Sequence, residues 1–368
     1  MSLVTRVLAT LVVSVLATTS FLAGSARAAG AEATKAADYI VSTFKPGTAA
    51  PYGEVGSAAD SLLALAATDD PKYAADIDGI VAFLKKNAKA YVAPKASGAA
   101  GAAKLALVAA AVDADATDFG GVDLVTTVKA GIGANGAFGA WPGPFASGMA
   151  MVALVRNGQP VPEQMVDYLL TYAEPRAGGA GGGFACTTYP FDAKTGCPAA
   201  DPDSTAMAVL GLQAVGSART GTAATVALEW LAGAQQADGS WQNYAPVNST
   251  GLVGPLFPAG SEQATRATGY VVAQQLPSGA LTTGTDTKAD LLATQQGILA
   301  LTGKTYATIG EPVAAAPSAP ATTEPTATPA PAPAAPSGTD PAVAWSVGVL
   351  VLASAGVVAV TAARGRRS

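Results

Sequence analysis

The stretch Trp230-Leu-Ala-Gly-Ala-Gln235-Gln-Ala-Asp-Gly239-Ser-Trp241 joins two helix-like segments through a loop rich in Gly and aromatic residues. A less regular copy follows at Tyr270-Val-Val-Ala-Gln-Gln275-Leu-Pro-Ser-Gly279. Residues 29–310 lack the apolar-polar alternation of strands, but pairs of helical segments joined by such loops recur along them. The sequence therefore predicts an all-α repeat domain over residues 29–310.

The second segment of each pair opens on a small hydroxyl or Gly cluster and then becomes apolar. The hydroxyl residues that mark these openings are Ser57, Ser97, Ser147, Ser204, Ser249 and Thr294. Residues 162–173 are polar on one face, whereas residues 205–215 are apolar almost all round, which indicates a surface helix and a buried helix. Six of each predict an α/α6 toroid with inner and outer rings, and an open solenoid is the alternative. Pro255 and Pro258 predict a short or kinked fifth inner helix.

The spacing of residues 230–241 resembles the QW repeat of squalene cyclases and related terpenoid cyclases, whose α/α toroid is shared with protein prenyltransferases. The resemblance extends over most of residues 33–303. It implies a structural role for Trp230, Gln235, Gly239 and Trp241, because the family's Gln and Trp clamp adjoining outer helices together. It implies the fold more than the activity, since this toroid also serves lyases, glycoside hydrolases and corrinoid-binding proteins.

The chain contains no histidine. A Ser-His-Asp or Cys-His catalytic device cannot be built, nor can the Asp, Cys, His zinc site of protein prenyltransferases. We expect no metal and no cofactor. Asp201-Pro-Asp203-Ser-Thr resembles the DxDD box of class II terpene cyclases, whose middle acid protonates an alkene, but Ser204 replaces its last Asp. The preferred interpretation makes Asp203 a helix N-cap, and a catalytic acid is the alternative.

Aromatic residues gather in the connections that lead into the predicted inner helices. The candidate ligand-binding residues among them are Trp141, Phe184, Tyr189, Trp241 and Tyr244. At one end of a closed ring they would form a mouth for an apolar or planar ligand, whereas hydrophobic plugs that hold loops down are the alternative. In the same region, Cys186 and Cys197 are the only cysteines of a chain that we expect to be exported, and they predict a disulfide.

Both ends of the chain indicate export and anchoring. Residues 1–28 carry Arg6, an apolar run and Ala26-Arg27-Ala28, typical of a cleaved signal peptide, and a first transmembrane span is the alternative. Residues 311–340 are a Pro/Ala-rich stalk, and residues 341–363 are uncharged from Val343 on and long enough to cross a membrane. The tail 364–368 is rich in Arg, which predicts a cytoplasmic C-terminus and a domain outside the cell membrane. No LPxTG motif precedes the span, so the organisation resembles a membrane-retained, actinobacterial-type surface protein.

The net charge of the part of the chain between the predicted signal peptide and tail limits the partners that the protein can bind. Of 21 basic residues, five lie in the predicted signal peptide and tail, which leaves 16 against 26 acidic residues, a net charge of −10. A nucleic-acid partner is not expected, because no basic face can be assembled. We therefore predict a membrane-anchored binding or scaffold protein with a small apolar or glycan ligand. An enzyme of terpene cyclase, polysaccharide lyase or glycosidase type is the alternative, although no complete catalytic site can be recognised.

Overall fold

The computed structural model describes residues 30–45, 49–50, 53–95, 97–175, 182–191, 194 and 197–311. Regular structure in these ranges is helical, with isolated β-bridges and no strand, so the all-α prediction is confirmed there. The predicted signal peptide, span, tail and nearly all of the stalk lie outside the described residues. Within the described ranges, none of the helices combines the length and apolar composition needed to cross a bilayer.

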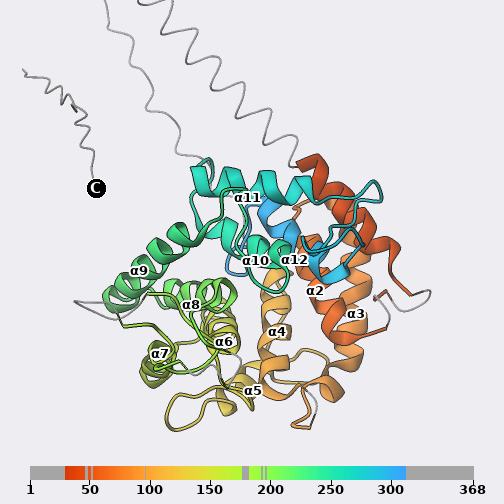
Figure 1. The fold of residues 1–368 in the computed structure, drawn as a ribbon. Coiled ribbons are helices and arrows are strands. Elements are labelled where there is room, and N and C mark those ends of the chain that lie inside the picture. The colour runs from red at the N-terminus through yellow and green to blue at the C-terminus, as the bar shows by residue number, and fades with distance from the viewer. Residues whose placement is uncertain are drawn as a thin grey trace, which may run out of the picture. The chain divides into compact units, whose positions relative to one another are not determined.

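Six largely buried helices surround the centre of the domain (Figure 1). They are α2 (Val55–Ala66), α4 (Gly98–Ala111), α6 (Pro144–Arg156), α8 (Pro202–Val215), α10 (Pro246–Val253) and α12 (Leu291–Thr302). Each contacts the next, and α12 returns to contact α2. These six helices therefore form a closed inner ring.

Six helices that are buried on one side lie around the periphery in Figure 1. They are the helix over residues 30–42, α3 (Ala74–Tyr91), α5 (Leu124–Ala130), α7 (Glu163–Leu170), α9 (Ala218–Ala234) and α11 (Glu262–Ala273). Two short 3₁₀ helices, Pro71–Tyr73 and Gly254–Leu256, also lie in the described residues. The outer and inner helices alternate along the chain, as in a closed double ring and not an open solenoid.

Glycines allow neighbouring inner helices to pack closely near their N-terminal turns. A Cβ atom at Gly148 of α6 would lie 2.0 Å from the carbonyl oxygen of Met207 in α8. A Cβ atom at Gly251 of α10 would lie 2.2 Å from the carbonyl oxygen of Gln296 in α12. The predicted shortening of the fifth inner helix is confirmed, because α10 ends at Val253 and a 3₁₀ turn that contains Pro255 follows.

A repeated hydrogen bond attaches three connecting loops, those that lead into α8, α10 and α12, to the inner helix that follows. The hydroxyl oxygen of Thr205 accepts from the backbone N–H of Phe184 at 2.9 Å, and that of Thr250 accepts from Trp241 at 3.1 Å. The hydroxyl of Thr294 accepts from the backbone N–H of Leu281 at 2.9 Å. The hydroxyls that make this bond thus belong to Thr205, Thr250 and Thr294. Ser204 and Ser249, which mark two of the openings in the sequence, each stand one residue before such a Thr.

Residues 303–311, here called the closing segment, cover the C-terminal ends of inner helices. Arg156, the last residue of α6, donates to the carbonyl oxygens of Ala110 at 3.3 Å, Tyr306 at 3.1 Å and Ile309. Its side chain is only 6% exposed. Gly310 packs so tightly that a Cβ atom there would lie 2.1 Å from the carbonyl oxygen of Ala111. The ring therefore has one closed end.

Candidate functional site: the mouth of the ring

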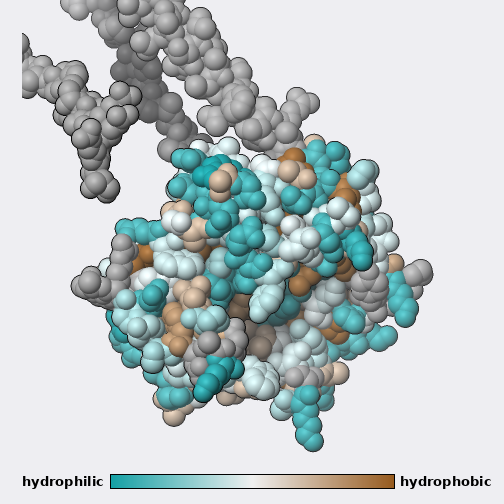
Figure 2. Space-filling model, viewed as in Figure 1, coloured by the Kyte–Doolittle hydropathy of each residue, from teal (hydrophilic) through white to brown (hydrophobic). Residues whose placement is uncertain are grey.

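The opposite end of the ring, here called the mouth, comprises the loops that lead into α6, α8, α10 and α12 and the first turns of these helices. Every exposed large hydrophobic side chain of the described residues belongs to it: Trp141, Phe145, Tyr189, Tyr244 and Leu292. Trp141 and Tyr244 are about as exposed as a side chain can be, at 90% and 91%. Figure 2 shows a face that is hollowed near the middle of the ring, with hydrophobic surface inside the hollow. Exposed apolar side chains gathered at one place indicate an interaction site.

Three of the five predicted ligand-binding aromatics lie on this surface, namely Trp141, Tyr189 and Tyr244. The prediction is wrong for Phe184 and Trp241, which have no exposed surface. Trp241 donates its indole N–H to the carbonyl oxygen of Leu231 at 2.7 Å and stacks on Phe257 with ring centroids 5.8 Å apart. These two side chains are plugs that hold their loops against the core, which was the alternative interpretation.

Phe145 and Leu292 are mouth residues that the sequence analysis missed. Leu292 stands two positions before Thr294, and Asp203 and Asn248 stand two positions before Thr205 and Thr250. Phe145 stands two positions before Ser147, which occupies the corresponding position of α6, although its hydroxyl makes no hydrogen bond among the described residues. Counting back from the repeated hydroxyl would therefore have placed all four of these residues at the mouth.

Asp203 is not the N-cap of α8, so the preferred interpretation of this residue is wrong. Asp201 is the N-cap, and its carboxylate accepts from the backbone N–H of Ser204 at 2.8 Å. Pro202 occupies the first helical position, where its fixed φ and missing N–H are tolerated, and this sets the cap one residue before it. Asp203 lies inside the first turn, where its charge benefits from the helix N-terminus without capping it.

The carboxylate of Asp203 is buried beside α10. One oxygen, Oδ2, accepts from the side-chain amide of Asn243 at 2.9 Å, whereas Oδ1 is buried and has no hydrogen-bond partner among the described residues. Burial raises the pKa of Asp203 to about 6, and the negative charge of Asp201 adds to the rise. The hydroxyl of Ser249, which is close to the carboxylate but outside hydrogen-bond geometry, and the amide of Asn243 oppose this rise. The result is a carboxyl group that changes charge near neutral pH.

In the N-terminal turns of the inner helices, two further buried atoms have no partner within the described ranges, Oδ1 of Asn248 on α10 and Oγ of Ser147 on α6. The loops before α8 and α12 contain two others, Oγ1 of Thr187 and Oε1 of Gln275. Together with Oδ1 of Asp203, the atoms of Asn248 and Ser147 place one unpaired polar atom on each of three successive inner helices. A buried acceptor without a donor costs on the order of 1–3 kcal/mol. Water or a ligand that donates hydrogen bonds would remove this cost.

The glutamines of the two QW copies connect outer helices. The amide of Gln235 donates to the carbonyl oxygens of Gly239 and Gln263, each at 3.0 Å, and so links the loop after α9 to α11. In the second copy, Gln275 donates to Gly279 at 3.0 Å and to Glu32 at 2.9 Å, which joins α11 to the first helix. Gln235 and Gln275 are therefore structural.

The loop that leads into α8 contains the predicted disulfide. Cys186 and Cys197 are bonded, with Cα atoms 5.7 Å apart, so this prediction is confirmed. Across the described ranges, no group of three His, Cys, Asp or Glu side chains is placed to hold a metal ion.

Comparison with known proteins agrees with this architecture. A crystal structure of a protein from Actinoplanes is 14% identical, with a TM-score of 0.54, over 75% of this chain and 99% of that chain, and at this identity the likeness shows the fold alone. No curated protein matches the sequence significantly. Residues 94–258 match the family model of the squalene-hopene cyclase C-terminal domain. This match confirms the resemblance to the terpenoid cyclase and protein prenyltransferase-like toroid family.

Proposed function

We propose that the protein is a membrane-anchored, extracytoplasmic binding module whose mouth takes an apolar or planar ligand. The observation that carries this proposal is the gathering of Trp141, Phe145, Tyr189, Tyr244 and Leu292 at one end of the ring. Each aromatic side chain can bury on the order of 150–250 Å² against a partner, at about 25 cal/mol per Å² of apolar surface. Folding gains nothing from leaving these side chains in water, so a ligand gives the best reason for them.

The unpaired acceptors below the aromatic rim support a ligand with a hydrogen-bond donor. The rim supplies apolar contact area, whereas Oδ1 of Asp203 and Oδ1 of Asn248 would orient the donor. A mostly apolar surface with a few convergent polar groups is the usual composition of a small-molecule site.

Anchoring by residues 341–363 remains part of this proposal. The described chain ends at Glu311 in the closing segment, so it leaves the ring at the closed end. The mouth is at the other end of the inner helices from this last described residue.

Acid-catalysed terpenoid chemistry is the second candidate, favoured by the buried carboxyl of Asp203 with a pKa of about 6. Against it, Asp201 is committed to the helix cap and Ser204 stands where the family's box has an acid. Replacing Asp203 by Asn separates the two candidates, because Asn can accept a hydrogen bond but cannot deliver a proton.

A binding assay with the full chain in detergent tests the proposal, with Nile red as a neutral, planar, apolar probe. The double variant Trp141→Ala/Tyr244→Ala should weaken probe binding by about tenfold, equivalent to about 1.4 kcal/mol. Phe83→Ala on the outer helix α3 is the control and should leave binding unchanged. Equal binding by the double variant and the wild-type protein would refute a mouth site. Turnover of an added polyprenyl substrate, lost in a stable Asp203→Asn variant, would instead establish the enzyme.

A further inference from the structure

Three consecutive inner helices, α12, α2 and α4, each carry one partly exposed polar residue in a buried stretch (Figure 1). These residues are Gln296, Asp60 and Lys104, and for each of them the two preceding and the four following residues are buried. Each stands five or six positions after the first residue of its helix, which is about 8 Å along the helix axis. The three side chains therefore lie at nearly the same depth in the ring.

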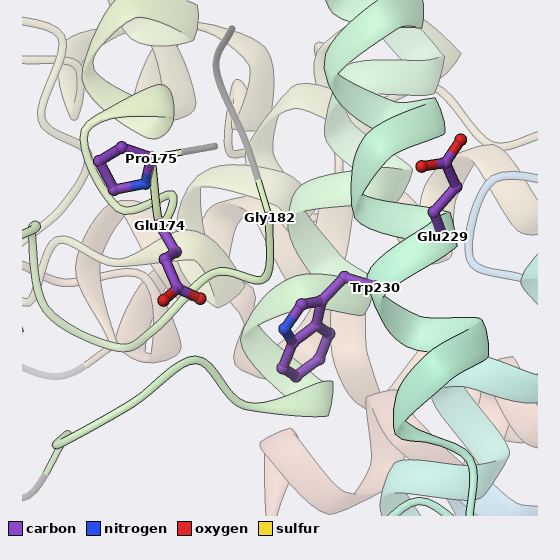
Figure 3. A pocket seen from close by; sticks show the side chains of 5 residues that line it. All are labelled: Glu174, Pro175, Gly182, Glu229 and Trp230. Atoms are coloured by element: carbon purple, nitrogen blue, oxygen red, sulfur yellow. The ribbon is translucent and has the colours of Figure 1, made fainter. Parts of the chain in front are cut away.

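The exposed parts of these side chains face the space enclosed by the six inner helices, here called the lumen. Outer helices cover the outward side, since α3 packs on α2 and α4 and α11 packs on α12. At the closed end, burial raises the pKa of the Tyr306 hydroxyl, the charge of Asp60 raises it further, and the side chain of Gln296 opposes the rise, so this hydroxyl lies beside both. The site is thus reached from the mouth. The cavity of about 350 Å³ between Glu174 and Trp230 is a different space, outside the inner ring (Figure 3).

Asp60 and Lys104 form an ion pair between α2 and α4. The ammonium nitrogen of Lys104 lies 2.9 Å from each carboxylate oxygen of Asp60, and the side chains of Lys104 and Asp60 are 22% and 18% exposed. Burial lowers the pKa of Lys104, but the charge and the hydrogen bond of Asp60 raise it by more, so Lys104 stays protonated. A buried ion pair seldom adds stability over apolar residues of the same volume, so folding alone does not explain this one.

The ion pair is suited to a neutral group that carries donors and acceptors side by side. The ammonium has N–H groups left to donate, and the carboxylate oxygens have lone pairs left to accept. A cation would be repelled by Lys104 and an anion by Asp60, whereas adjacent hydroxyl groups satisfy both, because each hydroxyl donates and accepts. Residues 46–48, 51–52 and 96, which lie outside the described ranges in the loops before α2 and α4, include no charged residue type.

We propose that the lumen binds the saccharide part of a glycoside whose apolar or planar part lies on the aromatic rim of the mouth. One sugar hydroxyl accepts from Nζ of Lys104, a neighbouring hydroxyl donates to the carboxylate of Asp60, and the amide of Gln296 binds a further hydroxyl. This assignment rests on the function proposed above, because the rim holds the other part of the same ligand. A zwitterionic head group would also match the pair, but it would have to lose the hydration of two charges.

The test is a calorimetric titration of the full chain in detergent with methylumbelliferyl glucoside, corrected by a titration of detergent alone. The methyl ether of methylumbelliferone supplies the planar part without the sugar, and methyl glucoside supplies the sugar without the planar part. Free tryptophan supplies a planar compound with a zwitterionic head group. The glycoside should bind about tenfold more tightly than the methyl ether, and methyl glucoside and tryptophan should bind more weakly than the glycoside.

Variants locate the sugar. The double variant Asp60→Leu/Lys104→Met removes the ion pair without leaving an unpaired charge, and it should weaken glycoside binding about tenfold while binding of the methyl ether stays unchanged. Asp38→Leu/Lys72→Met removes an exposed ion pair of the outer elements in the same way, and this matched control should change neither affinity. Gln296→Leu should weaken glycoside binding about threefold, and it keeps the test decisive if the double variant does not fold.

Four outcomes would overturn the saccharide site. Equal affinities of the wild-type protein for the glycoside and the methyl ether would refute it and leave the mouth proposal intact. If Nile red, the glycoside and the methyl ether all fail to bind, the mouth proposal falls as well. Tryptophan that binds as tightly as the glycoside would show a zwitterion site instead. A preference for the glycoside that survives in Gln296→Leu and in the double variant would place the sugar elsewhere.

Discussion

The two ends of the ring are formed by the same six helical hairpins, but their side chains differ: one end is covered and the other is exposed. At the closed end, Arg156 uses its guanidinium to bind three backbone carbonyls and is almost entirely buried. At the mouth, Trp141 and Tyr244 stand in solvent and Oδ1 of Asp203 has no partner within the described ranges. Nε of Arg156 also lacks a partner within the described ranges, so what separates the two ends is the exposed apolar surface of the mouth, which is typical of a functional surface.

Helix polarity explains part of this difference. All inner helices present their C-terminal carbonyls to the closed end, where the negative end of the helix dipole favours a cation such as Arg156. Their N-terminal N–H groups face the mouth, where negative charge is favoured, and the caps Asp201 and Asp290 lie there. A closed ring of parallel inner helices thus produces one end suited to a buried Arg and another suited to carboxylates.

Among the variants that test this difference between the ends, Arg156→Ala is expected to have the largest effect on stability. This variant loses all three hydrogen bonds and leaves buried carbonyl oxygens unsatisfied, so the free energy of unfolding should fall by about 4 kcal/mol. Chemical denaturation at neutral pH measures it. Arg156→Lys keeps the charge without the planar guanidinium and should recover only part of the loss. A loss below about 1 kcal/mol for Arg156→Ala would show that the closing segment contributes little.

The packing of the two ends can be compared through two glycines with nearly the same backbone conformation. Gly310 at the closed end has φ of 76°. Gly139, in the mouth loop that leads into α6, has φ of 72° and no atom within 4 Å of the place that a Cβ would occupy. Gly139→Ala should cost about 1 kcal/mol, from the positive φ alone. Gly310→Ala adds a collision with the carbonyl of Ala111 and should cost about 3 kcal/mol. Equal costs in thermal unfolding would mean that the closed end is not tightly packed.

At the mouth, Asp203→Asn is expected to stabilise the protein at neutral pH. The pKa of Asp203 rises from 3.8 to about 6 on folding, so the folded protein carries a buried charge at a cost once the pH exceeds both values. Below about pH 4 both states are protonated and the cost disappears. Wild-type stability should therefore fall as pH rises from about 4 to 6, and Asp203→Asn should gain about 2 kcal/mol at pH 7 and nothing at pH 3.5. A pH-independent difference would contradict this explanation.

The sequence predicted most helices of the ring. It did not predict the contacts that close one end or which side chains are exposed at the other. Helical periodicity and the loop around Gln235 predicted the alternation of helices, and Pro255 predicted the short α10. The closing segment was not predicted, because Arg156 and its partner Tyr306 are 150 residues apart and no local pattern links them.

Two predictions about the mouth were wrong: the helix position assigned to Asp203, and the exposure of two aromatic side chains. Asp203 was predicted to be the cap although Pro202 at the first helical position favours Asp201, a local rule that was not applied. Phe184 and Trp241 could not be separated from Tyr189 and Tyr244 by residue type, because burial depends on the helix that each loop packs against. The anchor and signal peptide stay predictions.

The smallest expected effect concerns Asp201, and it connects the cap to the charge of Asp203. Asp201→Ala removes the oxygen that accepts from Ser204 and should cost about 1 kcal/mol, whereas Asp201→Asn should cost only a few tenths, because Asn caps almost as well as Asp. Both variants remove the negative charge that helps to raise the pKa of Asp203, so in both the pKa of Asp203 should fall below about 6. Carboxyl ¹³C chemical shifts followed through a pH titration measure that pKa independently of stability. If Asp201→Asn preserves stability and lowers the pKa of Asp203, the cap and the electrostatic role are separate properties of one carboxylate. An unchanged pKa would mean that burial alone accounts for the titration of Asp203.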